Sequence, residues 1–183
     1  MFVKSYPRAR LMRGHLLAGL VGAMLLMVPV LSGLSGARAA SIGMMEGETL
    51  DKKDVTYPKD FDGKQTVMVM LFDQDQQSQL DGWAAGMADL PDGVAMIEVA
   101  LIGKVNGMVK YFIKGGMRDN IEDDPARMAR MMPYFGDADK VKKRLKITDI
   151  SEVQAFLLSP SGKVLWQASG DYDGQFKDMP TGQ

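Results

Sequence analysis

The chain has 183 residues, of which 22 are Lys or Arg and 23 are Asp or Glu, giving a formal net charge of −1. It contains no Cys and a single His, His15, near its start. Beyond that point there is neither thiol nor imidazole, which excludes Cys–His nucleophile pairs, His-based triads, ordinary zinc sites and thiol redox chemistry.

Residues 1–39 have the pattern of a signal peptide. A basic start without acidic residues precedes an apolar stretch between His15 and Gly36, and Ala37-Arg38-Ala39 supplies an A-x-A cleavage site. We predict an exported, periplasmic or comparable location, with cleavage after Ala39. Retention of the stretch as an N-terminal membrane anchor is the alternative, since it is about long enough to span a bilayer.

Removal of the leader changes the character of the chain. Taking 39 of the 183 residues leaves 144, a length that suits one compact domain. The leader holds five of the 22 basic residues and none of the 23 acidic ones, so the net charge falls from −1 to −6. We therefore expect no nucleic-acid partner, no affinity for anionic lipid and no membrane span after cleavage.

The first half of the remaining chain predicts two strands with a helix between them. We expect residues 40–57 to be an irregular, polar lead-in. The unbroken apolar run at 67–72 indicates a strand buried on both faces, and 94–102 indicates another, interrupted only by Glu98. Between them, apolar residues at i, i+3, i+4 and i+7 mark one face of a helix: Leu80, Trp83, Ala84 and Met87.

The middle of the chain predicts short helices and one strand. Pro125 suits the first turn of a helix, residues 131–135 can form a short strand, and Asp137 can cap a helix that runs to Leu145. Before these, Gly115-Gly116 is expected to end a helix, for which a strand is the alternative, with one apolar face: Val105, Met108, Val109, Phe112 and Ile113.

The last part carries the clearest signal. Residues 153–158 and 163–168 read as strands joined by the turn Ser159-Pro160-Ser161-Gly162, which predicts an antiparallel hairpin. A short helix is expected within 173–179. The order of elements predicts an α/β fold with a mixed parallel and antiparallel central sheet and helices on both faces.

This pattern resembles the thioredoxin-like family over residues 61–179. The resemblance rests on the Gly63-Lys64 turn, the strand at 67–72 with its helix-opening loop, and the closing hairpin at 156–164, where Ser159 replaces the usual Asp. It implies a single thioredoxin-like domain at 58–183.

Two departures from the family pattern bear on function. The resemblance aligns Gln76-Gln77-Ser78-Gln79 with the Cys-x-x-Cys pair of the family, and Val153 with its cis-proline. Both parts of the disulfide-exchange site are therefore missing, and the resemblance implies a redox-inactive member.

Within the family, the order of three segments is similar to the Atp10-like branch of ATP synthase assembly factors and its bacterial relatives. These segments are 116–121, 132–135 and the hairpin that ends at 168–170. The similarity implies an assembly or chaperone-like role with a protein or peptide partner, and it carries over no catalytic residue.

The loop after the first strand is a candidate binding site, because ligands of open α/β sheets bind at the carboxyl ends of strands and at helix N-termini. The alternative is a polar loop in which Asp75 or Ser78 caps the helix. As a site, the loop would offer amide and backbone groups to a peptide or carboxylate: Asp73, Asp75, Gln76, Gln77, Ser78 and Gln79.

An enzymatic alternative uses the same loop. An apolar strand followed by Asp-x-Asp resembles phosphatases of the haloacid-dehalogenase type, with Asp73 as nucleophile and Asp75 as acid and base around magnesium. Asp137 or Asp139 would complete the metal site. Gln77 stands where that family has Thr, and no cap domain is evident.

Charged clusters offer two further candidates. Arg118, Arg127 and Arg130 can together bind an anion or contact a partner, and ion pairs with the nearby acidic cluster at 122–124 are the alternative. That acidic cluster is expected to be a solvated helix start, with a weak calcium site as its alternative.

Methionine is abundant, with 16 residues in the chain and 12 of them after residue 39. Close groups of thioethers can hold Cu(I), and the groups are Met68 with Met70 and Met128 with Met131 and Met132. Core filling and a Met-rich groove for varied partners are the alternatives. We predict no cofactor and no resident metal, and a binding protein rather than an enzyme.

Overall fold

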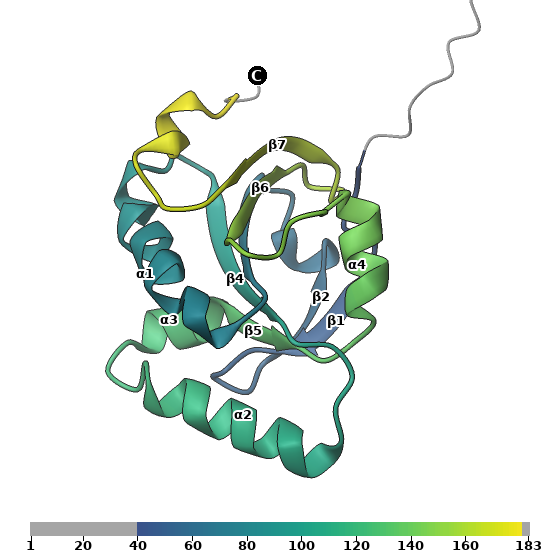
Figure 1. Ribbon diagram of the computed structural model, residues 1–183. Coiled ribbons are helices and arrows are strands. Elements are labelled where there is room, and N and C mark those ends of the chain that lie inside the picture. Colours follow the sequence, from purple (N-terminus) through teal and green to yellow (C-terminus); the bar gives the residue numbers. More distant parts are fainter. Residues whose placement is uncertain (1–39, 181–183) are drawn as a thin grey trace, which may run out of the picture. The chain divides into compact units, whose positions relative to one another are not determined.

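The computed structural model describes residues 40–180 of the chain (Figure 1). The predicted signal peptide and its cleavage site after Ala39 lie outside these described residues. Within 40–180, no helix has both the length and the apolar character needed to cross a membrane.

A five-stranded mixed sheet forms the centre of the described part, in the order β5-β4-β3-β6-β7. The first three strands pair in parallel, and β6 and β7 pair antiparallel, with β6 next to β3. The predicted fold class is confirmed, including the change from parallel to antiparallel pairing along the chain. The strands are β3 (Thr66–Leu71), β4 (Ala95–Leu101), β5 (Met131–Tyr134), β6 (Gln154–Leu158) and β7 (Val164–Ser169).

Helices cover both faces of this sheet (Figure 1). α1 (Gln77–Ala85) and α3 (Pro125–Arg130) lie on one face, α4 (Ala138–Leu145) lies on the other, and α2 (Gly107–Asp119) runs past the end of the sheet near β5. Residues 40–180 also contain four short 3-10 helices: η1 (Lys59–Phe61), η2 (Gln74–Gln76), η3 (Gly86–Asp89) and η4 (Gln175–Asp178). The last of them confirms the short helix expected near the end.

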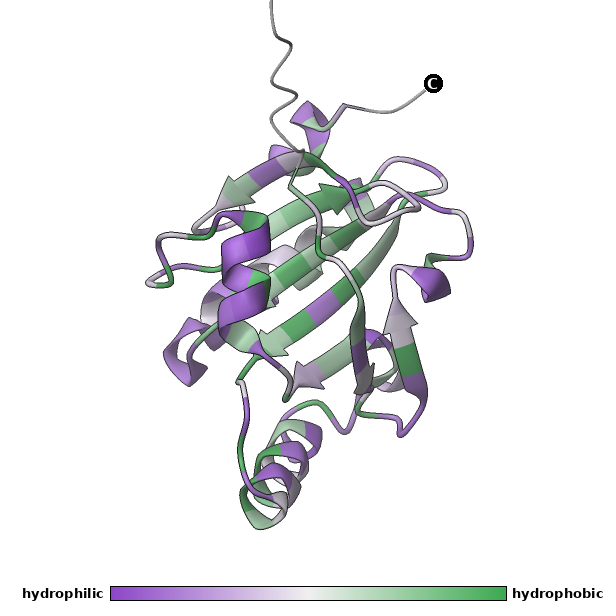
Figure 2. Ribbon diagram, turned by 90° about the vertical axis from the view of Figure 1, so that its right-hand side faces the viewer, coloured by the Kyte–Doolittle hydropathy of each residue, from purple (hydrophilic) through white to green (hydrophobic). Residues whose placement is uncertain are grey.

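β3 is buried on both sides because its side chains alternate between two cores. Met68 and Met70 pack with the α4 face, and Val67 and Val69 pack with the α1 face. Each fully buried aliphatic side chain contributes about 1.5–3 kcal/mol. Figure 2 shows the consequence, since the strands of the sheet are mostly hydrophobic while α4 is hydrophilic on its outer side.

The expectation of an irregular lead-in at 40–57 is wrong. This segment forms an antiparallel hairpin of β1 (Met45–Glu48) and β2 (Asp54–Tyr57) that packs beside β5. The carbonyl oxygen of Ala40 also accepts a hydrogen bond from the Val164 amide at 2.9 Å, and Ile42 is fully buried. Pairing with distant strands, rather than a local apolar pattern, makes this segment regular.

Two expectations about helix ends also need correction. α2 continues through Gly115 and Gly116 to Asp119, because both glycines keep helical geometry and the following turn is held by Met117, which packs against the core. Met87, expected on the inner face of the first helix, lies in η3 and is 40% exposed.

Tyr57 gives the hairpin side of the core a predicted sensitivity to high pH. The ring is 4% exposed and stacks on Phe61, and burial raises the pKa of Tyr57 to about 12. Between pH 10 and pH 12 only the unfolded chain loses this proton, so the free energy of unfolding falls as the pH rises through that window. A shift of this size corresponds to about 3 kcal/mol at most.

We expect Tyr57→Phe to flatten this fall while leaving stability near pH 8 almost unchanged. Urea unfolding of both proteins at pH 8, 10 and 11 tests the expectation. Parallel losses in the two proteins would show that Tyr57 is not the titrating group.

Candidate functional site

A cavity of about 490 Å³ opens at the carboxyl ends of the parallel strands. Its walls come from four segments that are far apart in the sequence: Phe72 after β3, residues 101–104 at the end of β4, residues 136–139 with Lys142 around the start of α4, and Ile150 before β6. Parallel strands bring their carboxyl ends to the same edge of a sheet, which is where ligands of α/β proteins bind.

The cavity combines an apolar wall with a few charges. Ile150 is 48% exposed and faces the cavity together with Phe72. Asp137 is occupied as the N-cap of α4, accepting from the Lys140 amide at 2.9 Å. Gly136 lets the wall approach closely, since a Cβ there would overlap the Tyr134 ring.

The remaining charges of the cavity are one ion pair and one free ammonium. Asp139 pairs with Lys142 at 2.8 Å, and the hydrogen bond from that ammonium lowers the pKa of Asp139. Among residues 40–180, Lys104 has no ion-pair partner. An apolar wall with a free cation at its rim suits an apolar side chain beside an acidic group.

None of the six residues of the predicted binding loop lines the cavity, and four of them make hydrogen bonds within the fold through their side chains. Asp73 caps η2 by accepting from the Asp75 amide at 3.0 Å. The N-cap of α1 is Gln76, without a side-chain cap hydrogen bond, so neither Asp75 nor Ser78 caps that helix. Gln77 donates to Asp81 at 2.8 Å. Asp75 and Ser78 are exposed on the surface.

Two glutamines of this loop join it to the segment before β6. The buried Gln76 accepts from the Phe72 amide at 2.7 Å and donates to the Ile150 carbonyl oxygen at 2.7 Å. Gln79 accepts from the Val153 amide at 3.0 Å. Gln76 therefore positions two walls of the cavity, and Gln79 ties α1 to the start of β6. The sequence pattern indicated neither role.

The carboxylates of the phosphatase hypothesis serve separate helix ends and ion pairs. Asp73 caps η2, Asp137 caps α4, and Asp139 binds Lys142. In the part of the chain that the structure describes, no three His, Cys, Asp or Glu side chains gather closely enough to hold a metal ion. Asp73 and Asp75 do not converge with Asp137 or Asp139 as the hypothesis requires.

The three arginines do not form one anion site. Arg127 and Arg130 bind the fully buried carboxylate of Glu98, with Nε–O distances of 2.9 and 2.8 Å. The second ion pair of Arg127 joins its Nη2 to Asp81 at 2.7 Å. Their partners therefore lie on β4 and α1 and not in the acidic cluster at 122–124. A lone Glu in an otherwise apolar strand was the available signal for a buried ion pair.

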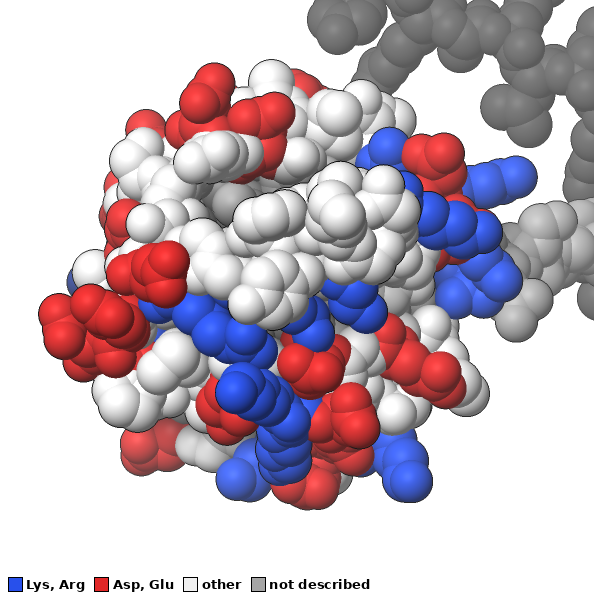
Figure 3. Space-filling view, turned by 90° about the horizontal axis from the view of Figure 1, so that it is seen from below, with Lys and Arg blue, Asp and Glu red and all other residues white. Residues whose placement is uncertain are grey.

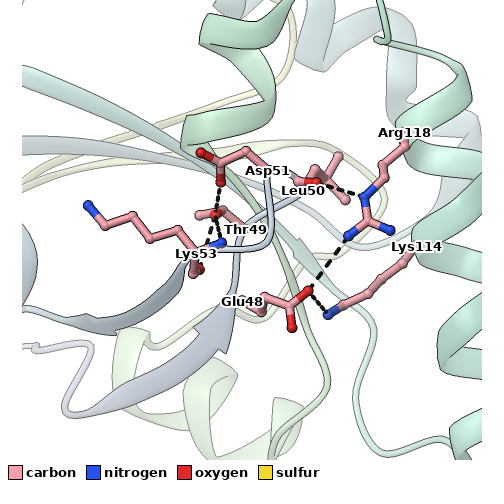
Figure 4. Close-up of polar contacts among 7 residues, drawn as sticks. All are labelled: Glu48, Thr49, Leu50, Asp51, Lys53, Lys114 and Arg118. Atoms are coloured by element: carbon pink, nitrogen blue, oxygen red, sulfur yellow. Dashed lines mark hydrogen bonds and ion pairs between the residues drawn. The ribbon is translucent and has the colours of Figure 1, made fainter.

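Arg118 is the third arginine, and it ties α2 to the β1–β2 hairpin (Figure 4). Its Nε donates to the Leu50 carbonyl oxygen at 2.7 Å, and its Nη2 lies 3.6 Å from Glu48. Lys114 also donates to Glu48 at 2.7 Å, and this hydrogen bond lowers the pKa of Glu48. α2 is thus held by its basic side.

The apolar side of α2 faces outward instead of inward. Met108, Tyr111 and Phe112 are 73%, 75% and 68% exposed, although the helical period of the sequence predicted a buried face. Figure 3 views α2 from outside and shows an uncharged ridge with basic side chains along one flank. We call the residues of this ridge the α2 face: Val105, Met108, Val109, Tyr111 and Phe112.

The methionines predicted as a copper site are divided by the sheet. Met68, Met70 and Met132 are fully buried in the core on the α4 side, whereas Met131 and Met128 belong to the opposite core. Their placement is that of core filling.

Comparison with known proteins gives the fold. No family model matches the chain, and no curated protein matches it in sequence. Yeast Sco1 with copper bound is 15% identical, with a TM-score of 0.53 over 75% of this chain and 87% of that one. BsSco, a member of the Sco family of cytochrome c oxidase assembly proteins, is 13% identical, with a TM-score of 0.52 over 77% and 90%.

A third similar structure is the exposed lipoprotein thioredoxin Etrx1 from Streptococcus pneumoniae. It is 10% identical, with a TM-score of 0.52 over 74% of this chain and 99% of that one. At such identities the likeness is one of architecture, and the conclusion is that this Cys-free chain has a thioredoxin-like fold.

Proposed function

We propose that this chain is an exported thioredoxin-like protein that binds a protein or peptide partner and acts as an assembly factor without thiol chemistry. The observation that carries the proposal is the cavity at the carboxyl edge of the sheet, walled by Phe72 and Ile150. The residues that line the cavity favour an extended peptide segment with an apolar side chain and with an acidic group near Lys104.

The apolar walls of this cavity are held in place before any partner arrives. One buried amide, that of Gln76, accepts from Phe72 and donates to Ile150, so the two walls are joined through a single side chain. A site that is already ordered loses less conformational entropy on binding. By the resemblance to the thioredoxin-like family, counted from the end of β3, Gln76 stands at the first position of the Cys pair, so a hydrogen-bonding amide takes the place of a thiol.

The assembly role and the location draw on resemblance. The similarity to the Atp10-like branch implies assembly of a protein complex, and BsSco is described as belonging to a family of assembly proteins. The leader at 1–39 supports export. The absence of any Cys removes thiol–disulfide exchange by this chain itself.

Site-specific photo-crosslinking in the cells that make the protein tests this proposal. A photoreactive amino acid at Ile150 should yield a discrete crosslinked protein, identified by mass spectrometry. The same probe at Leu165, which is 40% exposed on β7, is the matched control and should not yield it.

A second substitution asks whether the cavity itself is responsible. Phe72→Ala, verified as folded by urea unfolding, should reduce the Ile150 adduct several-fold, whereas Met44→Ala at an exposed position should leave it unchanged. Equal adducts at Ile150 and Leu165, or no effect of Phe72→Ala, would count against the cavity as a binding site. The Gln76 and Gln79 side chains are unsuitable probes because their loss disturbs the fold.

A further inference from the structure

The α2 face, four side chains of α2 with Val105 just before the helix, is the largest group of exposed apolar side chains close together in the sequence of the described residues. α2 is amphipathic, yet its basic side is docked and its apolar side faces solvent (Figures 3 and 4). Apolar residues gathered on a surface in this way mark an interaction site. The order of large, small and charged residues along α2 indicates which partner binds this face.

One side of α2 carries large side chains in its first half and a glycine in its second half. Met108, Phe112, Gly115 and Asp119 recur at i, i+4, i+7 and i+11, so they lie on one side of the helix. The first two are large, whereas at Gly115 and Gly116 nothing lies within 4 Å of where a Cβ would be. The stripe thus has two large apolar side chains in its first half and open space at Gly115, before the exposed Asp119 at its end.

These two halves fit each other in an antiparallel pair of identical helices. When the pair is centred between Phe112 and Gly115, Phe112 of each copy lies at the level of Gly115 of the other. The 13 residues of α2 are about 20 Å long, enough for the first half of one helix and the second half of the other to meet side by side. A two-fold axis at this point creates each contact twice.

The charges at the ends of α2 complement each other in the same arrangement. Lys104 precedes the helix, and Asp119, Glu122 and Asp123 stand at its far end, all of them exposed. Within residues 40–180 none of these four has an ion-pair partner. In an antiparallel pair the end with Lys104 meets the acidic end of the second copy.

We propose that the α2 face binds a second copy of this chain, forming a two-fold symmetric dimer through antiparallel α2 helices. The dimer shares Lys104 with the rim of the cavity, and its apolar contact through Phe112 needs no partner bound there. Sedimentation velocity of the protein, purified in the form that the cell produces, should give twice the mass of one chain at high concentration and dissociation on dilution.

Surface substitutions test the contact without disturbing the core. Phe112→Asp and Met108→Glu should give the mass of a single chain with an unchanged urea midpoint. Met44→Glu is the matched control, since Met44 is 66% exposed and lies off the α2 face, and it should leave the dimer intact.

Charge reversal tests the orientation. Lys104→Glu and Asp123→Lys should each weaken the dimer about tenfold, and the double variant should restore it. A wild-type protein with the mass of one chain at every concentration overturns the proposal, as does a dimer that Phe112→Asp leaves intact. Failure of the double reversal to restore the dimer overturns the antiparallel arrangement.

Discussion

Replacing Arg130 with Met should lower the free energy of unfolding by about 3 kcal/mol, because it leaves the Glu98 carboxylate buried with only one of its two cations. Glu98 lies in the middle of β4, between β3 and β5, and has no access to water. The loss is measured by urea unfolding followed by circular dichroism at pH 7.

The pH dependence of the same variant has a defined sign. Burial raises the pKa of Glu98, and the two guanidinium groups oppose that rise. Removal of Arg130 weakens the opposition, so the folded variant takes up a proton more readily than wild type. Its deficit in stability should therefore shrink as the pH is lowered from 7 toward 5.

Two further variants separate the buried network from ordinary surface charge. Replacing Glu98 with Leu and both arginines with Met should recover most of the loss, since a buried ion cluster replaced by apolar residues is often neutral in stability. Lys142→Met breaks an ion pair with the 91% exposed Asp139 and should cost at most about 1 kcal/mol. A loss for Arg130→Met as small as that of Lys142→Met would contradict the role of the network.

Trp83→Ala should destabilise the protein by about 3–5 kcal/mol, the range for removing a large buried aromatic side chain. The indole is fully buried, and its ring lies 5.2 Å from both Tyr172 and Phe176. Its Nε1 donates to the Gly170 carbonyl oxygen at 2.8 Å. Trp83 thereby fastens the last described segment to α1.

The location of the effect is as informative as its size. Hydrogen exchange should accelerate at 170–179 in Trp83→Ala before it does in β3. Trp83→Phe keeps the ring contacts and loses the hydrogen bond, so its loss should be about 1–3 kcal/mol. Trp166→Ala on β7 is the comparison, because Trp166 is only half-buried. If all three variants lost the same stability, the anchoring role of Trp83 would be wrong.

The sequence predicted where the candidate site lies in the fold, but not which residues line it. The apolar run of β3 placed the loop at the carboxyl edge of the sheet, and the cavity lies at that edge. The residues predicted to bind there cap η2 or face solvent, or join the two loops, because a Gln amide can serve a backbone group as well as a ligand. The walls that line the cavity, Phe72 and Ile150, carry no local signal of function.

The fold class and the lack of thiol chemistry could both be predicted from the residues alone. The periodicity of apolar residues shows which local segments form buried strands and helices. The order of these segments along the chain predicted parallel pairing early and antiparallel pairing late. The partners of the charged side chains and the direction of the α2 face became visible only in the folded chain. Lys114 and Arg118 orient that helix by binding Glu48 and Leu50, which lie more than 60 residues away in the chain. A local sequence pattern cannot predict contacts between segments so far apart.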